Sequence, residues 1–548
     1  MFRKHPKALY VLFFTEMWER FGYYLMVGIL LLYLIDNKTG GKGFDTRTAA
    51  DIVGSFIALV YLTPFIGGLL ADRYLGYLKS IFIGGSLMAA GYFGLAIPGD
   101  TAMFVSLGFI IVGNGFFKPN MSTLLGIIYN KDELKPLKDN AYSIFYMGVN
   151  IGALICNFVA AYLRNKYGWG YAFSAAGVGL VFALIWLASG LKHVKHANIK
   201  KPMEKEDASL TKIVLYVFLP AVVFGIIGWM IPDSIMGSDS NDAFIFACIP
   251  IISFYVSLWM RSSGQNKRAI GALFFIYTCS IIFWIIYNQN ATGLTIWAES
   301  HTDRKVTPVL EESAGFLDML QEVNPLLKEV PKVDQYFRPV LDENGIMIMT
   351  LGPDPYFNNL PKEEWPGENE NLKLVNAELF QSINPFFIIV FTPLIVGLFG
   401  WLAKRKKEPT TAAKFGLALF IAGLSSLVMV FAIISVSSVY THKTAAYWLF
   451  LTYGIFTVSE LFLSPIGLSL VSKLSPARTT ALMMGGWYLS TSLGGKAAGI
   501  MASFWNDFTD KTVFFLIITI AAFVGGALIF SRIKSLNAIV KEKTGSAA

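Results

Sequence analysis

Residues 16–24 read EMWERFGYY and set two glutamates and an arginine inside an otherwise apolar stretch from about Ala8 to Leu34. That stretch is long enough to cross a bilayer as one helix, which takes about 20 residues. A charge at mid-membrane costs about 2.5–3.5 kcal/mol on insertion scales, so such charges mostly mark a pathway or a proton relay. The stretch therefore predicts a membrane helix with functional charges. A self-neutralising Glu–Arg–Glu knot that only fixes packing is the alternative.

The rest of the chain repeats this apolar pattern. Of its 548 residues, 54% are hydrophobic and 15% charged, whereas soluble domains carry about 25% charged residues. Long apolar runs recur as six, then two, then six, which predicts an all-α polytopic membrane protein. The predicted spans are 8–34, 50–72, 78–97, 102–127, 141–163, 170–190, 211–231, 243–261, 268–298, 378–403, 412–437, 445–471, 477–505 and 511–532.

This spacing predicts three parts and one insertion. Residues 1–190 form an N-terminal six-helix bundle, and 191–266 a cytoplasmic linker with two additional membrane helices. Residues 267–548 form a C-terminal six-helix bundle, which an extracytoplasmic insertion at 300–376 interrupts. Lys and Arg gather in alternate loops, which places both termini in the cytoplasm of a multi-pass inner-membrane protein.

The insertion itself differs in composition from the spans. Residues 301–375 hold 14 acidic and 7 basic residues and no spanning run. Helical periodicity is expected over 307–323, and two strands around an Asn-Gly turn over 336–351. We expect a small folded cap or a partly ordered loop there.

The charged residues of the first span share one face. At 100° per residue, Glu16, Glu19, Arg20 and Tyr23 fall within an arc of roughly 100°, with Tyr24 at its edge. Polar residues also interrupt later spans, and these are Lys118, Asn150, Asn384 and Glu460. Lys118 could snorkel to the membrane surface, whereas Glu460 stands too near the middle of its helix for that.

Residues 67–76, GGLLADRYLG, bridge spans two and three. Small residues permit close helix approach, and Asp72 and Arg73 can lock or release a cytoplasmic gate. A plain tight turn is the alternative, although it would need only one glycine.

Four motifs resemble the proton-dependent oligopeptide transporter (POT) family of the major facilitator superfamily. They are EMWERFGYY, GNGFFKPN at 113–120, FYMGVNIG at 145–152 and ELFLSPIGLS at 460–469. The first is highly specific, while GGLLADRYLG alone indicates only the superfamily. The resemblance covers the chain except 301–375. It implies the major facilitator fold, with two six-helix bundles and two extra linker helices, and an insertion between core spans 7 and 8.

The resemblance also implies a function, the proton-coupled import of di- and tripeptides by alternating access. Arg20 and Lys118 would hold the peptide carboxylate, and Glu460 with Asn384 the amino terminus. Glu16 and Glu19 would couple protons. The cationic pole (Arg20 and Lys118) and the anionic pole (Glu460) belong to different bundles, as a midplane site between rocking halves requires. The implied pocket walls are Tyr23, Tyr24, Tyr61, Asn150, Trp284 and Trp487.

Four positions depart from the family pattern. Val27 and Asn288 stand where members often carry a paired Arg and acidic residue, and Gly54 where animal relatives have His. Lys496 stands where Asn is expected, and it is either a snorkelling residue or an added cavity charge. Because Asn288 cannot titrate, we expect proton coupling through the first helix alone and an extracellular gate that closes on apolar contacts.

Three alternatives remain at this point. The chain could carry another small anion or amino-acid conjugate, or be an uncoupled peptide facilitator. A membrane-embedded enzyme or receptor is the rival from another class, but the five histidines lie outside or at the ends of spans and no catalytic constellation appears. We expect no enzyme activity, cofactor, metal or nucleic acid. The expected partners are peptides, protons and the lipid bilayer, and the expected state is a monomer.

Overall fold

The structure is a computed structural model that describes residues 5–37, 40–198, 213–306, 311–312, 319–343, 347–367, 370–475 and 480–544. Within these residues a helix lies over each predicted span. Ten of the described helices are long and apolar enough to cross a membrane by length and composition. A polytopic helical protein is therefore confirmed, and the count of fourteen spans stays a prediction.

The first half of the molecule is a group of six long helices that pack on one another. Gly76 (φ 79°) and Gly168 (φ 95°) are the N-caps of α3 and α6, and each has a positive φ, which glycine adopts without strain. The six helices are α1 (Lys7–Ile35), α2 (Thr46–Leu70, continued by the π-helical turn η2, Ala71–Leu75), α3 (Tyr77–Gly94), α4 (Asp100–Ile128), α5 (Lys138–Tyr167) and α6 (Trp169–Ser189).

The second half begins with a helix that is broken. The predicted span 268–298 consists of α11 (Gly264–Asn288), the 3-10 turn η6 (Gln289–Ala291) and α12 (Gly293–Ser300). Thr292 leaves the helical region with φ −129° and ψ −101°. The remaining elements are η9 (Ala377–Ser382), α14 (Ile383–Lys404), α15 (Thr411–Ile434), α16 (Tyr447–Leu474), α17 (Thr480–Ser503), α18 (Lys511–Ser531) and the amphipathic α19 (Ile533–Thr544).

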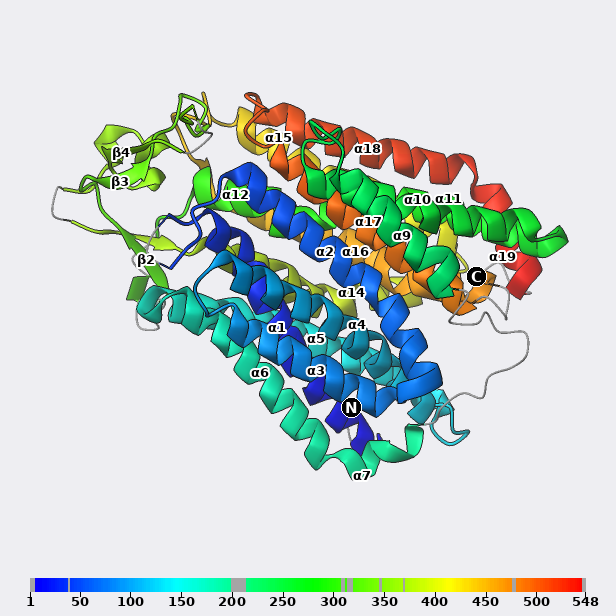
Figure 1. Cartoon of the computed structure of the whole chain (residues 1–548). Helices are drawn as coiled ribbons and strands as arrows, with labels where there is room; N and C mark the ends of the chain where they lie inside the picture. Colours follow the sequence, from blue (N-terminus) through cyan, green and yellow to red (C-terminus); the bar gives the residue numbers. More distant parts are fainter. Residues whose placement is uncertain are drawn as a thin grey trace.

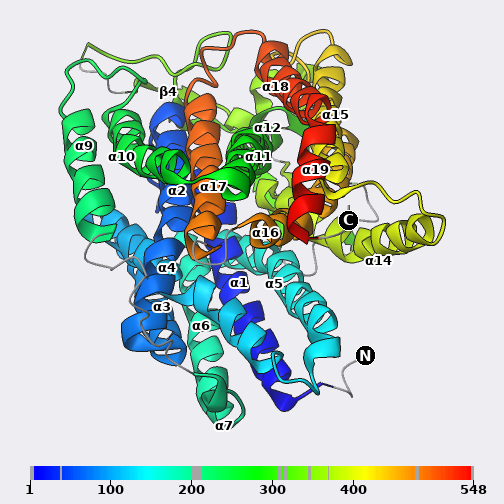
Figure 2. The ribbon, with the colours of Figure 1, turned by 90° about the vertical axis from the view of Figure 1, so that its right-hand side faces the viewer.

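The two halves meet along α2 and α17, with a smaller contact between α5 and the η9–α14 segment (Figure 2). A helical hairpin of η5 (Val214–Phe218), α9 (Leu219–Trp229) and α10 (Asp239–Arg261) lies beside α2. The chain between α6 and this hairpin includes the short α7 (Leu191–Val194) and η4 (Lys195–Ala197). The hairpin is therefore a neighbour of the inter-half contact.

The insertion folds as paired short strands at one end of the molecule, away from both termini (Figure 1). We call this the insertion end and the opposite one the termini end. The parallel pair is β1 (Thr302–Asp303) with β6 (Thr444–Ala445), and the antiparallel pairs are β2 (Leu320–Val323) with β5 (Leu372–Val375) and β3 (Lys328–Pro331) with β4 (Met349–Gly352). The predicted helix is wrong at 320–323, which form β2, and 313–318 lie outside the described residues.

The predicted strand pair over 336–351 is partly confirmed. Leu341 and Met347 form an antiparallel bridge. The strand that pairs with β4, however, is β3, which lies upstream of the predicted range. The Asn-Gly dipeptide at 344–345 lies outside the described residues.

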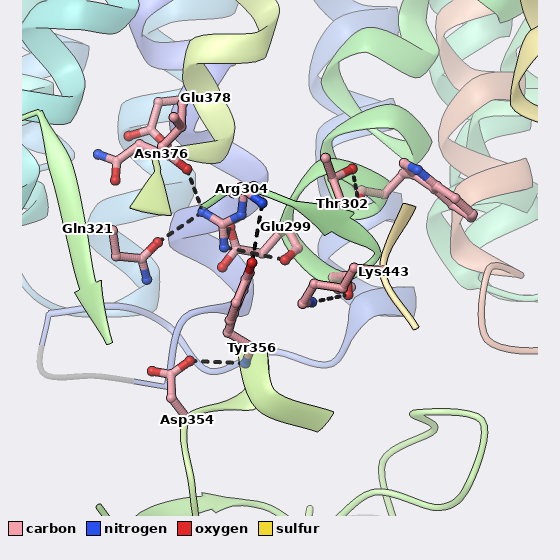
Figure 3. A network of polar contacts seen from close by, with 12 residues as sticks. Glu299, Thr302, Arg304, Gln321, Asp354, Tyr356, Asn376, Glu378 and Lys443 are labelled. Atoms are coloured by element: carbon pink, nitrogen blue, oxygen red, sulfur yellow. Dashed lines mark hydrogen bonds and ion pairs between the residues drawn. The ribbon is translucent and has the colours of Figure 1, made fainter. Parts of the chain in front are cut away.

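A buried arginine joins the insertion to the second half (Figure 3). Arg304 is 1% exposed, and its Nη1 donates to Gln321 Oε1 (3.1 Å) and to the Val375 carbonyl (2.9 Å). Its Nη2 lies 3.1 Å from Glu299 Oε2 at the end of α12. Removing one partner of a buried ion pair is strongly destabilising. Arg304 therefore fixes β2 and β5 on the end of the broken helix.

Candidate functional site

A largely enclosed cavity of about 50 Å³ lies between the two halves. Its polar lining comes from both halves, which is the arrangement expected of a site that opens and closes with them. The polar and aromatic lining residues are Tyr24, Tyr146, Asn150 and Asn157 from α1 and α5, and Tyr287, Asn290, Gln381, Asn384 and Glu460 from the second half.

Glu460 is the carboxylate of this cavity. It is 5% exposed, and its Oε2 accepts a hydrogen bond from Asn384 Nδ2 at 2.9 Å. Tyr146 of the other half also hydrogen-bonds Glu460. Both of these partners are neutral, so the carboxylate would gain from a cation brought to it.

The cation of α1 is already held by its own helix. Arg20 donates through Nε to Glu19 Oε2 (2.5 Å) and through Nη2 to Glu19 Oε1 (2.8 Å). Its Nε also lies 3.3 Å from Glu16 Oε1, and its guanidinium lies over the Tyr23 ring at 5.1 Å. All four side chains are buried. They share one inward face, as the helical spacing predicts.

Lys118 of α4 extends this charged group. Its Nζ lies 4.3 Å from the centre of the Tyr61 ring, and the ammonium interacts electrostatically with Arg20, Glu19 and Glu16. The ammonium therefore lies inside the protein, and the snorkelling alternative is wrong for Lys118.

An aromatic wall connects the charged group to the cavity. The Trp284 ring lies 6.5 Å from that of Tyr61, 6.2 Å from that of Trp487 and 5.4 Å from that of Tyr287. Tyr24 hydrogen-bonds Tyr287 and interacts electrostatically with both Arg20 and Glu460. The two poles therefore share tyrosines as neighbours.

The predicted pocket residues divide into two sets. Those that line the cavity are Tyr24, Asn150, Asn384 and Glu460. Those that form the adjoining charged and aromatic group are Arg20, Tyr23, Tyr61, Lys118, Trp284 and Trp487. The structure therefore places a charged pole on each side of the inter-half space.

Sequence reasoning missed five of the polar and aromatic lining residues: Tyr146, Asn157, Tyr287, Asn290 and Gln381. Helical spacing was the available signal for two of them. Tyr146 precedes Asn150 by four residues, and Asn157 follows it by seven, so all three share a face of α5. Asn290 belongs to the η6 break, where regular spacing carries no information.

The predicted gate Asp72–Arg73 lies at the termini end, in the π-helical turn η2. Asp72 is partly buried. The Arg73 side chain lies outside the described residues, so the gate stays a prediction.

Polar bonds cross between the halves at the insertion end. Gln381 Nε2 donates to the Gly28 carbonyl (2.9 Å), and Asn157 Nδ2 donates to Ser382 Oγ (3.1 Å). A Cβ at Gly28 would meet Asn157 Oδ1 at 2.4 Å, so a side chain at this position would displace the Asn157 amide. Arg164 of α5 also pairs with the buried Glu378 at 3.4 Å. The expectation that this end closes on apolar contacts is therefore wrong, because amides and an ion pair supply the closure.

The departures from the expected pattern have distinct surroundings. Val27 is buried beside Gly28, and Asn288 donates to the Trp284 carbonyl of its own helix at 2.7 Å. Lys496 is 2% exposed and pairs with Asp51 at 2.7 Å. Lys496 thus neither snorkels nor lines the cavity.

Comparisons with known proteins cover most of the chain. The model of the POT family matches residues 78–351 and 369–530. The "Uncharacterized transporter YclF" of Bacillus subtilis (strain 168) is 30% identical over 96% of this chain and 93% of its own. A "Di-/tripeptide transporter" of Lactococcus lactis subsp. lactis (strain IL1403) is 29% identical over 89% of this chain and 87% of its own.

Solved structures agree with these matches. A crystal structure described as peptide transporter POT in complex with sulfate has a TM-score of 0.76 and 29% identity, over 98% of this chain and 96% of its own. A POT family transporter in complex with 5-aminolevulinic acid has a TM-score of 0.76 and 25% identity, over 98% of both chains. The fold is thus similar over nearly the whole chain.

Proposed function

This chain belongs to the POT family, and from that premise we propose that it is a proton-coupled symporter that imports di- and tripeptides by alternating access. Relatives named di-/tripeptide transporters support the substrate class. The family consists of transporters, and the helices make this one a multi-pass membrane protein. The substrate, the coupling and the roles of single residues belong to the proposal.

The observation that carries the proposal is the pair of opposite poles on different halves. A peptide is a zwitterion of variable length, so its recognition needs a cationic and an anionic group with adaptable walls between. Arg20 and Lys118 supply the first pole, and Glu460 with Asn384 supplies the second. A peptide that bridges the poles would pull the two halves together.

The size of the cavity supports alternating access. Ligand pockets usually enclose about 300–1,000 Å³, whereas this cavity has about 50 Å³. A peptide fits only after the halves separate. Because the described polar bonds hold the insertion end closed, the separation that admits substrate must break them.

The geometry of Arg20 suggests how a proton would take part. Glu19 occupies two donors of Arg20, so a peptide carboxylate must compete with it for the guanidinium. A proton taken up on the Glu19 or Glu16 carboxylate cancels the competing charge and frees Arg20 for the substrate. When the proton leaves on the other side, the carboxylate reclaims Arg20 and the peptide is released. Asn288 cannot titrate, which leaves the coupling to α1.

The proposal includes the orientation and the assembly. The insertion end faces the extracytoplasmic side of the inner membrane and both termini face the cytoplasm, with fourteen spans in the parts 1–190, 191–266 and 267–548. Asp72 and Arg73 gate the cytoplasmic side, and the protein acts as a monomer. The alternating Lys- and Arg-rich loops support the orientation.

Uptake of a radiolabelled dipeptide into liposomes, with and without an imposed proton gradient, tests the proposal. Accumulation that requires the gradient is the expected result. Uptake that only equilibrates would make the protein an uncoupled facilitator. No uptake of any dipeptide, in vesicles whose protein is folded, would contradict peptide transport.

A carrier of another small charged molecule or amino-acid conjugate is the second candidate. The structurally similar transporter in complex with 5-aminolevulinic acid favours it, since that ligand also carries an amine and a carboxylate. A simple anion is disfavoured, because it would leave Glu460 without a role. Competition of dipeptide uptake by 5-aminolevulinic acid distinguishes the two.

A further inference from the structure

Lys496 makes a complete set of bonds across the contact of the two halves. Its Nζ donates to Asp51 Oδ1 (2.7 Å), Ser55 Oγ (2.6 Å) and Ser240 Oγ (3.1 Å). An ammonium group has three donors, so every one is used. Lys496 belongs to α17 of the second half, whereas Asp51 and Ser55 belong to α2 of the first. The ion pair therefore exists only while these helices touch.

The linker hairpin contributes the other side of this network. Asp51 Oδ2 accepts from Ser238 Oγ (2.9 Å) and Ser240 Oγ (2.6 Å). Ser238 is also the N-cap of α10 and accepts from the Asn241 amide at 3.2 Å. The start of α10 thus orients the Asp51 carboxylate toward Lys496. The hairpin joins the halves at the contact that must break when they part.

The backbone next to the ion pair is packed as closely as glycine permits. A Cβ at Gly54 would stand 2.6 Å from the Gly499 Cα. One turn further along α2, Ile57 is 2% exposed and faces Gly495, where a Cβ would meet its Cγ2 at 2.6 Å. Gly54 and Lys496 are both departures from the expected pattern, and one contact now accounts for both. A larger residue at 54 would push α17 away from α2, and with it Lys496 away from Asp51.

We propose that Lys496, Asp51 and the α10 serines Ser238 and Ser240 form a further closure of the insertion end, beside the bonds between α5 and η9, and that the linker hairpin is part of this gate. The inference rests on the alternating access proposed above. Opening toward the insertion end separates α2 from α17 and breaks the Lys496–Asp51 pair. The serines then keep Asp51 hydrogen-bonded, which lowers the cost of the open state. Lys496 is a positioning residue, since it is not among the lining of the cavity.

Cysteine labelling tests the closure without any substrate. Ile57→Cys is placed in a background with Cys156, Cys248 and Cys279 replaced by alanine, and a membrane-impermeant maleimide is added on the insertion side of oriented vesicles. Lys496→Met should raise the labelling rate about tenfold, because loss of the pair shifts the population toward the open state. Asp51→Asn should act alike. The charge exchange Asp51→Lys with Lys496→Asp should return the rate to within about twofold of the parent.

Lys511→Met is the matched control. Lys511 is also a buried lysine at the insertion end, but its Nζ donates to the Trp505 carbonyl within the second half. Its labelling rate should equal that of the parent. Ser240→Ala keeps the charges of Asp51 and Lys496 but removes the Ser240 hydroxyl that bonds to both of them. It should raise the labelling rate about threefold, and it replaces Lys496→Met as the test if that variant does not fold.

The outcomes separate this inference from the proposed function. Unchanged labelling in folded Lys496→Met, or in Ser240→Ala where the former does not fold, would overturn the closure. An equal rise in Lys511→Met would overturn it as well. If labelling responds as expected while no peptide is taken up, the closure stands and the proposed substrate falls.

Discussion

Arg20 is bound by the carboxylates that would control its access to substrate. It uses Nε and Nη2 on Glu19, and its Nε also faces Glu16 at 3.3 Å. A bidentate contact of this kind depends on the planar guanidinium and not only on its charge. The role proposed for Arg20 therefore depends on the shape of its guanidinium as much as on its positive charge.

Arg20→Lys should therefore lose most transport although the positive charge is kept. A lysine offers a point charge and cannot reproduce the fork on Glu19 or on a peptide carboxylate. We expect initial dipeptide uptake to fall about tenfold or more. Arg338→Lys, at an ion pair with Asp334 in the insertion, is the control and should transport normally. Near wild-type uptake by Arg20→Lys would remove this role.

Glu460 should read the amino terminus of the peptide. Acetylation of that terminus leaves the buried carboxylate without its cation, which costs about 2–5 kcal/mol, or roughly thirtyfold or more in affinity. An acetylated dipeptide should therefore compete poorly with wild-type uptake. In Glu460→Gln the gap between free and acetylated peptides should narrow. Equal competition by both peptides in the wild type would make the assignment wrong.

Coupling through α1 predicts a division between two transport assays. Glu16→Gln and Glu19→Gln should abolish accumulation driven by a proton gradient while sparing counterflow, which needs no net proton movement. Asn288→Ala should keep its dependence on the gradient, since the Asn288 side chain donates to the Trp284 carbonyl of its own helix and cannot titrate. Gradient-driven accumulation by both glutamine variants would place the coupling elsewhere.

At this scale the sequence predicted the charged residues better than their surroundings. Charges inside apolar runs stand out, and the face shared by Glu16, Glu19 and Arg20 follows from helix geometry. Partners on other helices do not follow from spacing. The bond of Gln381 to Gly28, 353 positions apart in the chain, depends on how the halves pack.

Among the elements, the helix break and the insertion were the least predictable. The break at η6 interrupts a run that is apolar enough to read as one helix, and Gln289 satisfies part of it by accepting from the Gly293 amide at 3.2 Å. In the insertion, the pattern at 320–323 suited a helix, but pairing with β5 decided for a strand. Tertiary context overrides local propensity in such short segments.

His301 lies where α12 meets the insertion, and its surroundings predict how acid changes the stability of this part of the protein. Its ring lies 4.8 Å from that of Trp297, and burial, aided by Lys511 and Lys443, lowers the pKa of His301 from 6.5 to about 3. The folded state therefore binds the proton more weakly than the unfolded state. The stability that neutral His301 contributes is fully present above about pH 6.5. It is lost as the pH falls toward 3, by up to about 1.4 kcal/mol per pH unit.

Thermal unfolding in detergent at pH 7.5, 5.5 and 4.5 checks this. His301→Gln cannot titrate, so its deficit in apparent melting temperature against the wild type should shrink as the pH falls. The exposed His196, changed to Gln, is the control and should run parallel to the wild type. A constant deficit for His301→Gln across the series would contradict a buried neutral histidine.

At the scale of the whole molecule, the order of the helices could be predicted and their docking could not. Hydropathy shows where helices lie, because each must be apolar over its length. It does not show that α2 and α17 touch, or that α10 stands against α2, since these contacts rest on glycines and on pairs such as Asp51–Lys496.

The proposed orientation makes a prediction for the two ends. Leu327 lies beside β3 and is 69% exposed. The variant Leu327→Cys should react with an impermeant maleimide added to intact cells. Ser535→Cys on α19 should react only after the membrane is permeabilised. Both variants need the background without native cysteines. The reverse pattern would invert the topology and with it the direction of import.

The contact between β2 and α5 gives the insertion a further consequence. Asn165 of α5 donates to the Leu320 carbonyl at 3.1 Å, so the insertion, anchored on the second half by Arg304, also touches the first. An antibody fragment whose epitope includes both α5 and β2 at this contact would bind only the state in which they touch. By linkage, the fragment stabilises that state by the same free energy by which that state strengthens binding of the fragment. Such a fragment would inhibit import non-competitively, and its own affinity would fall as this contact opens.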